Sequence, residues 1–428
     1  MIPEAIKKHI TGRASIAPLA VFRFLFGFIM LVSIIRFAAN GWIYDLYVKP
    51  DYFFTFYGFD WVTPLGELGM YALFLGMGLA ALSIMLGYYY RIGITFFFLA
   101  FTYVELIDKT NYLNHYYFVS IVSFLLMFVP ANRSFSLDVL LNPSLRRKYV
   151  PAWTINIFKL QLGLVYFFAG VAKLNPDWLL NAMPLQIWLP ANADLPIVGP
   201  LLEYTASAYI FSWAGAFYDL TIAFFLLWKR TRVLAYLAVI VFHMFTWFLF
   251  QIGMFPFIMI LCTLIFFSAD FHKKVIRFIS GLKNYFPFSL PESKHIEKKN
   301  FQLSKSMNGI ISGILIIHFV LQFLVPLRFM LYPGNLFWTE QGFRFSWRVM
   351  LMEKAGHATF HIRNPETGNE WQVRNWDYLT PNQEKEMSTR PDMILQFAHH
   401  LEDEYQKNFG GDVIITAESH VTLNGRRS

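Results

Sequence analysis

The first long apolar stretch of the chain, IAPLAVFRFLFGFIMLVSIIRFA at residues 16–38, decides the fold class. A helix needs about 20 consecutive apolar residues to cross the core of a bilayer, and this stretch is long enough. Lys7, Lys8 and Arg13 precede it, as positive residues precede the apolar region of a signal peptide. Its length is nevertheless that of a full span, and no small-residue cleavage site follows. The stretch therefore predicts an uncleaved membrane anchor.

The same apolar character continues along the first three quarters of the chain. The 428 residues are 56% hydrophobic, 19% aromatic and only 15% charged, a balance that excludes an ordinary soluble protein. Further apolar runs lie at 68–87, 92–107, 116–131, 154–172, 206–228, 233–250, 253–269 and 309–327, and the third and fourth of the nine runs are short. We predict an all-α polytopic membrane bundle of about nine transmembrane helices over residues 1–327.

The positive residues lie in the polar breaks between these runs, and they predict the orientation. Across nine spans, nineteen lie on one side and three on the other. The larger group is Lys7, Lys8, Arg13, Arg91, Arg133, Arg146, Arg147, Lys148, Lys229, Arg230, Arg232 and eight more from Lys273 to Lys305; the smaller is Lys49, Lys109 and Lys173. Because cytoplasmic loops are rich in Lys and Arg, we predict an integral membrane protein with a cytoplasmic N-terminus and a periplasmic or lumenal C-terminal domain. Topology thus explains the net charge of +8, and nothing indicates nucleic-acid binding.

Residues 328–428 read as a small domain outside the membrane. Strand-like stretches lie at 343–353, 356–363 and 412–423, with turn residues at 364–368. Apolar residues recur at helical spacing after Pro391, and Gly410-Gly411 ends that helix. We predict a β-rich α+β extracytoplasmic domain that is too short to be a separate enzyme. The chain closes with a polar tail at 424–428, which leaves open whether a further strand follows.

Ionisable residues inside the apolar runs are functional hypotheses by default, because burying charge in a membrane is costly. We expect Arg23 and Asp219 to be structural, through an ion pair or carbonyl contacts. Lys159 is predicted to extend its ammonium group to the inner surface, and His318 to be a core histidine. Glu105 lies near the outer end of the third run.

Polar residues gather at the outer ends of the fourth and fifth runs, on the side predicted for the C-terminal domain. Asp108-Lys109-Thr110 and Asn114-His115 precede the fourth run, and Ala169 to Leu174 ends the fifth. A lysine at the rim of an apolar pocket can lose its proton, because desolvation disfavours the ammonium form, and it then serves as a base. A histidine such as His115 could share or steer that proton. The alternative is that Lys173 simply reaches the lipid headgroups.

Several of these stretches carry a resemblance to a known family. They are Asp108-Lys109-Thr110 with Asn114-His115, then VYFFAGVAKL at 165–174 followed by Asp177-Trp178, and Phe242-His243 leading to IGMF at 252–255. Further matches run from VFRFLFG at 21–27, through 85–87 and 90–92, to Trp338-Thr339 and Ser346-Trp347. In this order and spacing, over nearly the whole chain, the sequence resembles vitamin K-dependent γ-glutamyl carboxylase, as a bacterial relative of the HTTM-domain family.

The resemblance implies a membrane carboxylase that converts protein glutamate to γ-carboxyglutamate. Oxygenation of a reduced naphthoquinone, vitamin K or menaquinol, to its epoxide would drive the reaction with O2 and CO2, and no metal is predicted. Lys173 matches the family's base, and His115 matches a histidine that assists near the glutamate. The resemblance also suggests that Asn114, His243, Trp347 and Met350 bind substrate or quinone. The implied partners are a glutamate-containing protein or peptide, the quinone and the lipid bilayer.

The sequence departs from the animal members of the family in three places. They carry two adjacent lysines where this chain has Ala172-Lys173, and the retained lysine matches the base. The cysteines that form their disulfide are missing here, since Cys262 is the single cysteine and reads as a buried, inert thiol. The shorter C-terminal part puts a propeptide-docking surface in doubt.

Three other functions stay open from the sequence. A quinol epoxidase would keep the oxygenation without the carboxylation. A proton-coupled transporter could use Arg23, Asp219 and His243 along its path, although no internal repeat supports it. A bis-histidine haem protein is disfavoured because His115, His243 and His318 do not form facing pairs.

Overall fold

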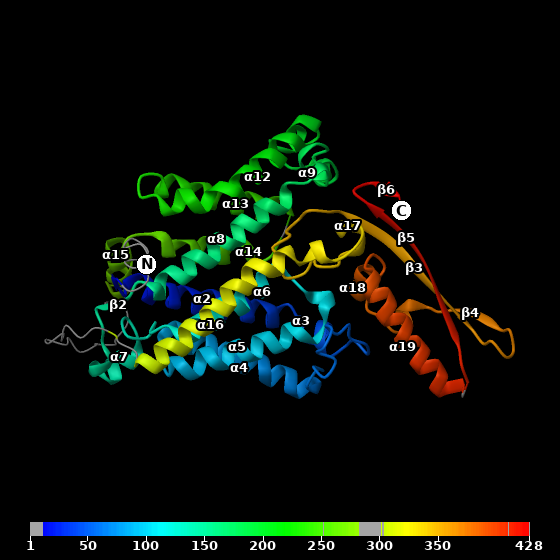
Figure 1. Ribbon diagram of the computed structural model, residues 1–428, viewed down its shortest axis with the longest axis horizontal. Coiled ribbons are helices and arrows are strands. Elements are labelled where there is room, and N and C mark those ends of the chain that lie inside the picture. Colours follow the sequence, from blue (N-terminus) through cyan, green and yellow to red (C-terminus); the bar gives the residue numbers. More distant parts are fainter. Residues whose placement is uncertain (1–11, 251, 282–300, 302–303, 410, 428) are drawn as a thin grey trace.

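The apolar runs form a layer of long helices, and the C-terminal domain lies at one end of them (Figure 1). The computed structural model describes residues 12–250, 252–281, 301, 304–409 and 411–427. Lys7, Lys8, Gly410 and the lysines between 282 and 300, on which the predictions of orientation and of the last helix end partly rest, lie outside the described residues.

Seven helices among the described residues are long and apolar enough to cross a membrane. They are α2 Ala17–Ala39, α4 Gly66–Leu86, α5 Tyr90–Ile107, α8 Trp153–Lys173, α12 Thr205–Leu227, α13 Arg232–Phe250, and α16 Lys305–Leu324 with its extension η6 Val325–Leu331. Two shorter apolar helices, α6 Asn114–Phe128 and α14 Phe255–Thr263 with η4 Leu264–Phe266, form at the fourth and eighth predicted runs. The helical membrane fold is confirmed, whereas the count of nine spans stays a prediction.

Short elements connect the long helices on the two sides of the layer. On the side of the C-terminal domain they are α3 Trp42–Tyr47, η1 Lys109–Asn111, α9 Pro176–Leu179, α10 Leu185–Trp188, η3 Pro190–Asn192 and α11 Gly199–Leu202. On the opposite side they are α7 Leu137–Leu141, η2 Pro143–Leu145, α15 Ala269–Gly281 and an antiparallel pair of strands, β1 Arg13–Ser15 and β2 Tyr149–Pro151.

Arg23 lies on α2 and binds the end of α4. Its Nη1 donates to the carbonyl of Ile84 at 2.5 Å and of Met85 at 2.8 Å, and its Nη2 donates to the carbonyl of Phe135. The last carbonyls of a helix lack intrahelical partners and carry partial negative charge. The guanidinium therefore caps α4 and joins it to the loop between α6 and α7, where Phe135 lies.

The predicted strand at 343–353 is wrong, because the structure forms turns there. Phe345, Trp347 and Met350 have positive φ angles of 60°, 59° and 54°. Side chains of the membrane part take the place of a neighbouring strand: the Phe345 amide donates to the Tyr112 hydroxyl at 2.8 Å, and Asn114 Nδ2 donates to the Arg348 carbonyl at 2.9 Å. The turn segment is held against the bundle, with Trp347 only 1% exposed.

The C-terminal domain contains a four-stranded antiparallel sheet in the order β4-β3-β5-β6. The strands are β3 Lys354–Arg363, β4 Glu370–Gln372, β5 Ile414–Leu423 and β6 Arg426–Arg427, and the accompanying helices are α17 Leu336–Thr339, η7 Asn375–Asp377, α18 Pro381–Met387 and α19 Pro391–Phe409. Alternate residues of β3, such as Phe360, pack with Phe397 and Leu401 of α19. Phe54, from the loop after α3, is buried in the same core. The predicted tail is not a simple polar end, because β6 pairs with β5.

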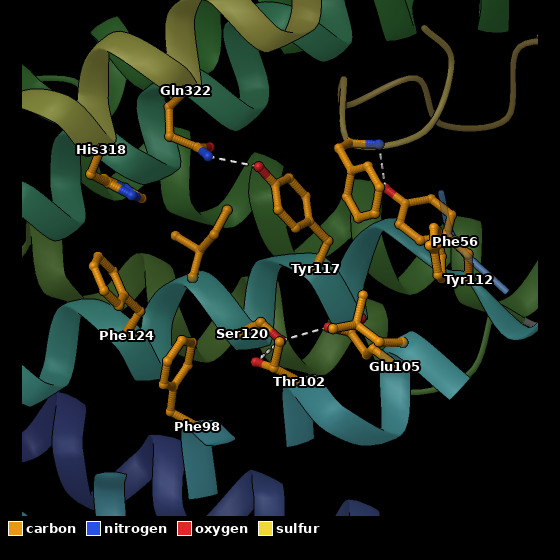
Figure 2. A pocket seen from close by; sticks show the side chains of 13 residues that line it. Phe56, Phe98, Thr102, Glu105, Tyr112, Tyr117, Ser120, Phe124, His318 and Gln322 are labelled. Carbon is orange, nitrogen blue, oxygen red and sulfur yellow. Dashed lines mark hydrogen bonds between the residues drawn. The ribbon is translucent and has the colours of Figure 1, made fainter. Parts of the chain in front are cut away.

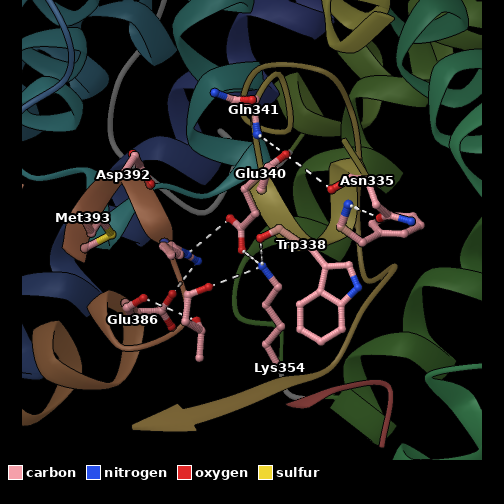
Figure 3. A network of polar contacts seen from close by, with 12 residues as sticks. Asn335, Trp338, Glu340, Gln341, Lys354, Glu386, Asp392 and Met393 are labelled. Carbon is pink, nitrogen blue, oxygen red and sulfur yellow. Dashed lines mark hydrogen bonds and ion pairs between the residues drawn. The ribbon is translucent and has the colours of Figure 1, made fainter. Parts of the chain in front are cut away.

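A polar network joins several segments of this domain (Figure 3), and Lys109 of the membrane part pairs with one of its members, Asp392. Lys354 Nζ lies 2.7 Å from Glu340, and Asp392 lies 2.9 Å from both Lys109 and Arg344. Burial lowers the pKa of Lys354, partly offset by Glu340. Burial opposes ionisation of Asp392, but Arg344 and Lys109 together hold its pKa below its ordinary value. The Lys109–Asp392 pair therefore contributes to docking of the domain, and the other two pairs hold the domain itself together.

Candidate functional site

Lys173 is the last residue of α8, and the structure pairs it with a carboxylate from α12. Lys173 Nζ lies 2.7 Å from Asp219 Oδ2, and both side chains are 7% exposed. The ammonium group also lies 5.2 Å from the centre of the Trp178 ring. Lys173 is thus buried in the protein and does not extend to the lipid headgroups.

Gly170 of α8 allows that helix to approach α12 closely next to this pair. A Cβ at Gly170 would lie 2.7 Å from the Leu220 backbone nitrogen, closer than real Cβ contacts. Gly215 of α12 is less closely enclosed, because a Cβ there would make an ordinary contact with Lys173 Cε at 3.9 Å. Small residues such as Gly170 let helix backbones meet in a membrane, and here the close approach lies next to the two charged side chains.

A buried lysine–carboxylate pair can exist in two proton arrangements. Removing both groups from water is costly for the charged pair, while the carboxylate at hydrogen-bond distance favours the ammonium form. Transfer of one proton from Lys173 to Asp219 gives a neutral amine beside a neutral acid. The pair can therefore present an unprotonated amine without moving net charge into the membrane.

The pair faces a cavity of about 90 Å3 between α8, α12, α13 and α14. Its wall is mostly aromatic and aliphatic, and its lining includes Tyr166, Trp178, Trp188, Phe211, Phe242, His243, Phe250, Phe255, Met259, Val349 and Met350. Val349 and Met350 come from the turn segment that replaces the predicted strand. The C-terminal part of the chain therefore closes this membrane cavity.

His243 is another polar group of the cavity lining. Its Nε2 lies 3.2 Å from the Tyr166 hydroxyl, and its Nδ1 is buried with no hydrogen-bond partner among the described residues. A buried polar atom without a partner costs free energy unless a ligand or water satisfies it. His243 thus offers one unused hydrogen-bonding position next to the cavity.

The remaining predicted residues lie around the cavity or away from it. His115 is one layer behind the wall, with its ring 5.7 Å from that of Phe255, and Asn114 is bonded to the Arg348 carbonyl. Trp347 does not line the cavity, because it stacks on Tyr117 at 4.9 Å. The structure therefore brings together Lys173, His243 and Met350.

Arg23 does not join this group. It binds the carbonyls at the end of α4, whereas Asp219 and His243 line the Lys173 cavity. Of the three residues that a transport path would have used, two therefore line one cavity and Arg23 binds elsewhere.

Sequence reasoning missed the role of Asp219 as the partner of Lys173, and it missed Tyr166 and Trp178. Asp219 lies 46 residues from Lys173, so no local spacing rule could connect them. Tyr166 and Trp178 lie inside the stretches that carry the family resemblance. Their place in these stretches is the feature of the sequence that could have indicated a role at the site.

The C-terminal strand holds the turn that follows Lys173. Asp177 accepts from Arg426 Nη1 and from Asn424 Nδ2, both at 2.9 Å, and Arg426 Nη2 also donates to it. The next residue, Trp178, donates through its indole to the Ser212 carbonyl at 2.8 Å and covers the Lys173 ammonium. The far end of the chain therefore supports the surroundings of the buried pair.

Comparison with known proteins agrees with this architecture. The HTTM domain family matches residues 13–271, and the lumenal domain of vitamin K-dependent gamma-carboxylase matches residues 307–428, beginning within α16. No solved structure matches the chain. Within the described residues, no group of three or more His, Cys, Asp or Glu side chains could hold a metal ion. The protein is an integral membrane protein that belongs to the HTTM-domain family and resembles the γ-glutamyl carboxylases, with a C-terminal domain of their lumenal type.

Proposed function

We propose that this protein converts glutamate residues of a protein or peptide to γ-carboxyglutamate, coupled to oxygenation of a reduced naphthoquinone with O2 and CO2. The observation that carries the proposal is the Lys173–Asp219 pair at 2.7 Å, facing a largely apolar cavity beside the C-terminal domain. Menaquinol is the reductant that we favour. We place the N-terminus in the cytoplasm, and we place residues 328–428 in the periplasm or lumen as a domain distinct from 1–327.

The reaction has two requirements that this arrangement could meet. The γ-carbon of glutamate is too weakly acidic for a side-chain base, so a stronger base must arise from the quinone in a site that excludes water. Lys173, as a neutral amine, would take the first proton from the hydroquinone hydroxyl, and Asp219 would hold the proton that Lys173 carried before. The aromatic wall would keep water away from the reacting atoms.

The lining residues have the chemical character that a quinone ring needs, but the cavity is too small for the ring unless some side chains move. Phe250, Phe255 and Met350 offer apolar contacts, and His243 Nδ1 offers one hydrogen-bonding position. The cavity of about 90 Å3 is smaller than the roughly 150 Å3 that holds benzene. We therefore expect binding to displace flexible side chains, Met350 first, because an unbranched thioether adapts most readily.

The glutamate would approach from the side of the C-terminal domain. Asn114 and His115 begin α6 on that side, and the His115 ring lies 5.7 Å from that of Phe255, which lines the cavity. Asn114 Nδ2 donates its hydrogen bond to the Arg348 carbonyl, so a substrate would have to compete with this carbonyl for Asn114. This position behind the wall is the specific feature that favours the second candidate, a quinol epoxidase without carboxylation.

One assay separates these functions. Purified protein in lipid nanodiscs receives reduced menaquinone, O2, labelled bicarbonate and a glutamate-rich peptide. We expect label in the peptide and epoxide in the quinone. Epoxide without label identifies a quinol epoxidase, and the absence of both products contradicts the proposal.

A further inference from the structure

A second cavity lies within the membrane part, between α5, α6 and α16 (Figure 2). Its volume is about 280 Å3, against about 90 Å3 at Lys173, and the two cavities share no lining residue. Phe98, Phe124 and Phe345 form part of its apolar wall. Since a cavity of roughly 150 Å3 holds benzene, this one has room for a larger flat ring.

Glu105 provides a hydrogen-bond acceptor on one side of this cavity. Its Oε2 accepts from the Ser120 hydroxyl at 2.5 Å, and Ser120 accepts from Thr102 at 3.2 Å. Its Oε1 has no hydrogen-bond partner, and no cationic side chain pairs with Glu105, among the residues that the structure describes. A carboxyl oxygen facing an apolar cavity without a donor is unfavourable, so a ligand that donates a hydrogen bond would relieve it.

Tyr117 provides a donor on the opposite side. Its hydroxyl oxygen accepts from Gln322 Nε2 at 2.7 Å, and Gln322 Oε1 accepts from Gln161 at 2.9 Å. The hydroxyl hydrogen of Tyr117 has no acceptor in the described part of the chain. Figure 2 shows Tyr117 and Gln322 on one side and Glu105 with Ser120 and Thr102 on the other.

We propose that this cavity binds a phenolic ring, with the ligand hydroxyl donating to Glu105 and an oxygen on the far side of the ring accepting from Tyr117. A reduced quinone has both features, whereas an oxidised quinone has acceptors only. The cavity therefore selects the reduced form and is a second, non-catalytic site for the hydroquinone. The identification with the hydroquinone rests on the proposed function, while phenol binding itself does not.

The test measures equilibrium binding of 1-naphthol to the full-length protein in lipid nanodiscs by titration calorimetry. The control ligand is 1-methoxynaphthalene, which has the same rings without a hydroxyl hydrogen. Glu105→Gln keeps the size of the side chain and an acceptor for Ser120, and Glu67→Gln, at the exposed start of α4, is the matched control. Ile121→Trp fills the cavity from a different residue.

We expect Glu105→Gln to weaken 1-naphthol binding about tenfold, as loss of a buried hydrogen bond does. Ile121→Trp should abolish this binding, Glu67→Gln and Lys173→Ala should retain it, and wild-type protein should bind 1-methoxynaphthalene more weakly. Wild-type affinity in Glu105→Gln and Ile121→Trp, or loss in Lys173→Ala, overturns the proposal. If Glu105→Gln does not fold, the proposal is still tested by the affinity of Ile121→Trp for 1-naphthol and by the affinities of the wild-type protein for the two ligands. Failure of the carboxylase assay would leave this binding result unchanged, so the two proposals can fail separately.

Discussion

Asp219 and Glu105 are both carboxylic acids within membrane helices, and their surroundings differ in the partner of the carboxyl group and in the volume of the cavity beside it. Asp219 has a lysine at 2.7 Å and faces a cavity of about 90 Å3. Glu105 has a serine hydroxyl at 2.5 Å and faces a cavity of about 280 Å3. A paired acid can exchange a proton with its partner, whereas an unpaired acid is available to a ligand. The residue that pairs with an intramembrane acid therefore indicates what the acid can do. The residue type and its depth in the membrane do not indicate this by themselves.

The largest expected effect on stability concerns the buried pair. Asp219→Leu leaves the Lys173 ammonium without its partner, and loss of one member of a buried pair costs about 3–5 kcal/mol of unfolding free energy. The double variant Lys173→Met/Asp219→Leu should recover much of that loss, since no charge is left unpaired. Glu105→Gln should change stability by less than about 1 kcal/mol. Unfolding in detergent measures these three variants and the single variant Lys173→Met, and single effects that add in the double variant would contradict the coupling.

The second effect concerns the helix contact that brings Lys173 to Asp219. Gly170→Ala places a methyl group 2.7 Å from the Leu220 backbone nitrogen, and such overpacking costs about 1–3 kcal/mol. Gly313→Ala on α16 is the control, because a Cβ there meets nothing within 4 Å. Thermal unfolding midpoints should fall for the first variant only, and equal midpoints would show that α8 and α12 are not in close contact.

The third effect concerns the clamp on the turn after Lys173. Arg426→Gln removes the ion pair with Asp177, but the Arg426 side chain is 55% exposed, so solvent screening limits the loss to about 1 kcal/mol or less. Arg427→Gln, on the same strand and without an ion pair among the described residues, is the control. We expect faster proteolysis of the C-terminal strand in Arg426→Gln alone. Identical digestion of the two variants would argue against the clamp.

The smallest effect is a pH dependence of domain docking. Arg344 and Lys109 lower the pKa of Asp392 against the opposing effect of burial, so the ionised form is favoured in the folded protein. This stabilisation is present above the unfolded pKa of about 3.9 and is lost as pH falls through the lower folded value. Wild-type protein should therefore have a higher thermal unfolding midpoint than Asp392→Asn at pH 6. The difference between the two midpoints should vanish in strong acid. A difference that persists in strong acid would have another origin.

The helical membrane fold could be predicted because length and apolar character are local properties of sequence. The turn segment 343–353 could not be predicted. Its buried apolar residues are typical of a strand, but side chains of Tyr112 and Asn114, rather than a neighbouring strand, supply its hydrogen bonds. Spacing and resemblance brought out Lys173, His243 and Met350, which meet at one cavity. The Lys173–Asp219 pair and the partner-free oxygen of Glu105 depend on which helices pack together, and no local pattern encodes that.

The most direct measurement of the proposed role of Lys173 compares Lys173→Ala with Lys159→Ala, a lysine on the same helix α8. Alanine preserves the helix, and loss of a catalytic base lowers the rate about 10²–10⁴-fold. We predict that Lys173→Ala stays folded and membrane-inserted, loses epoxide formation and peptide labelling together, and is partly restored by a small added amine. Lys159→Ala should keep both activities. Near wild-type epoxide formation by Lys173→Ala at neutral pH would contradict the assignment of the base.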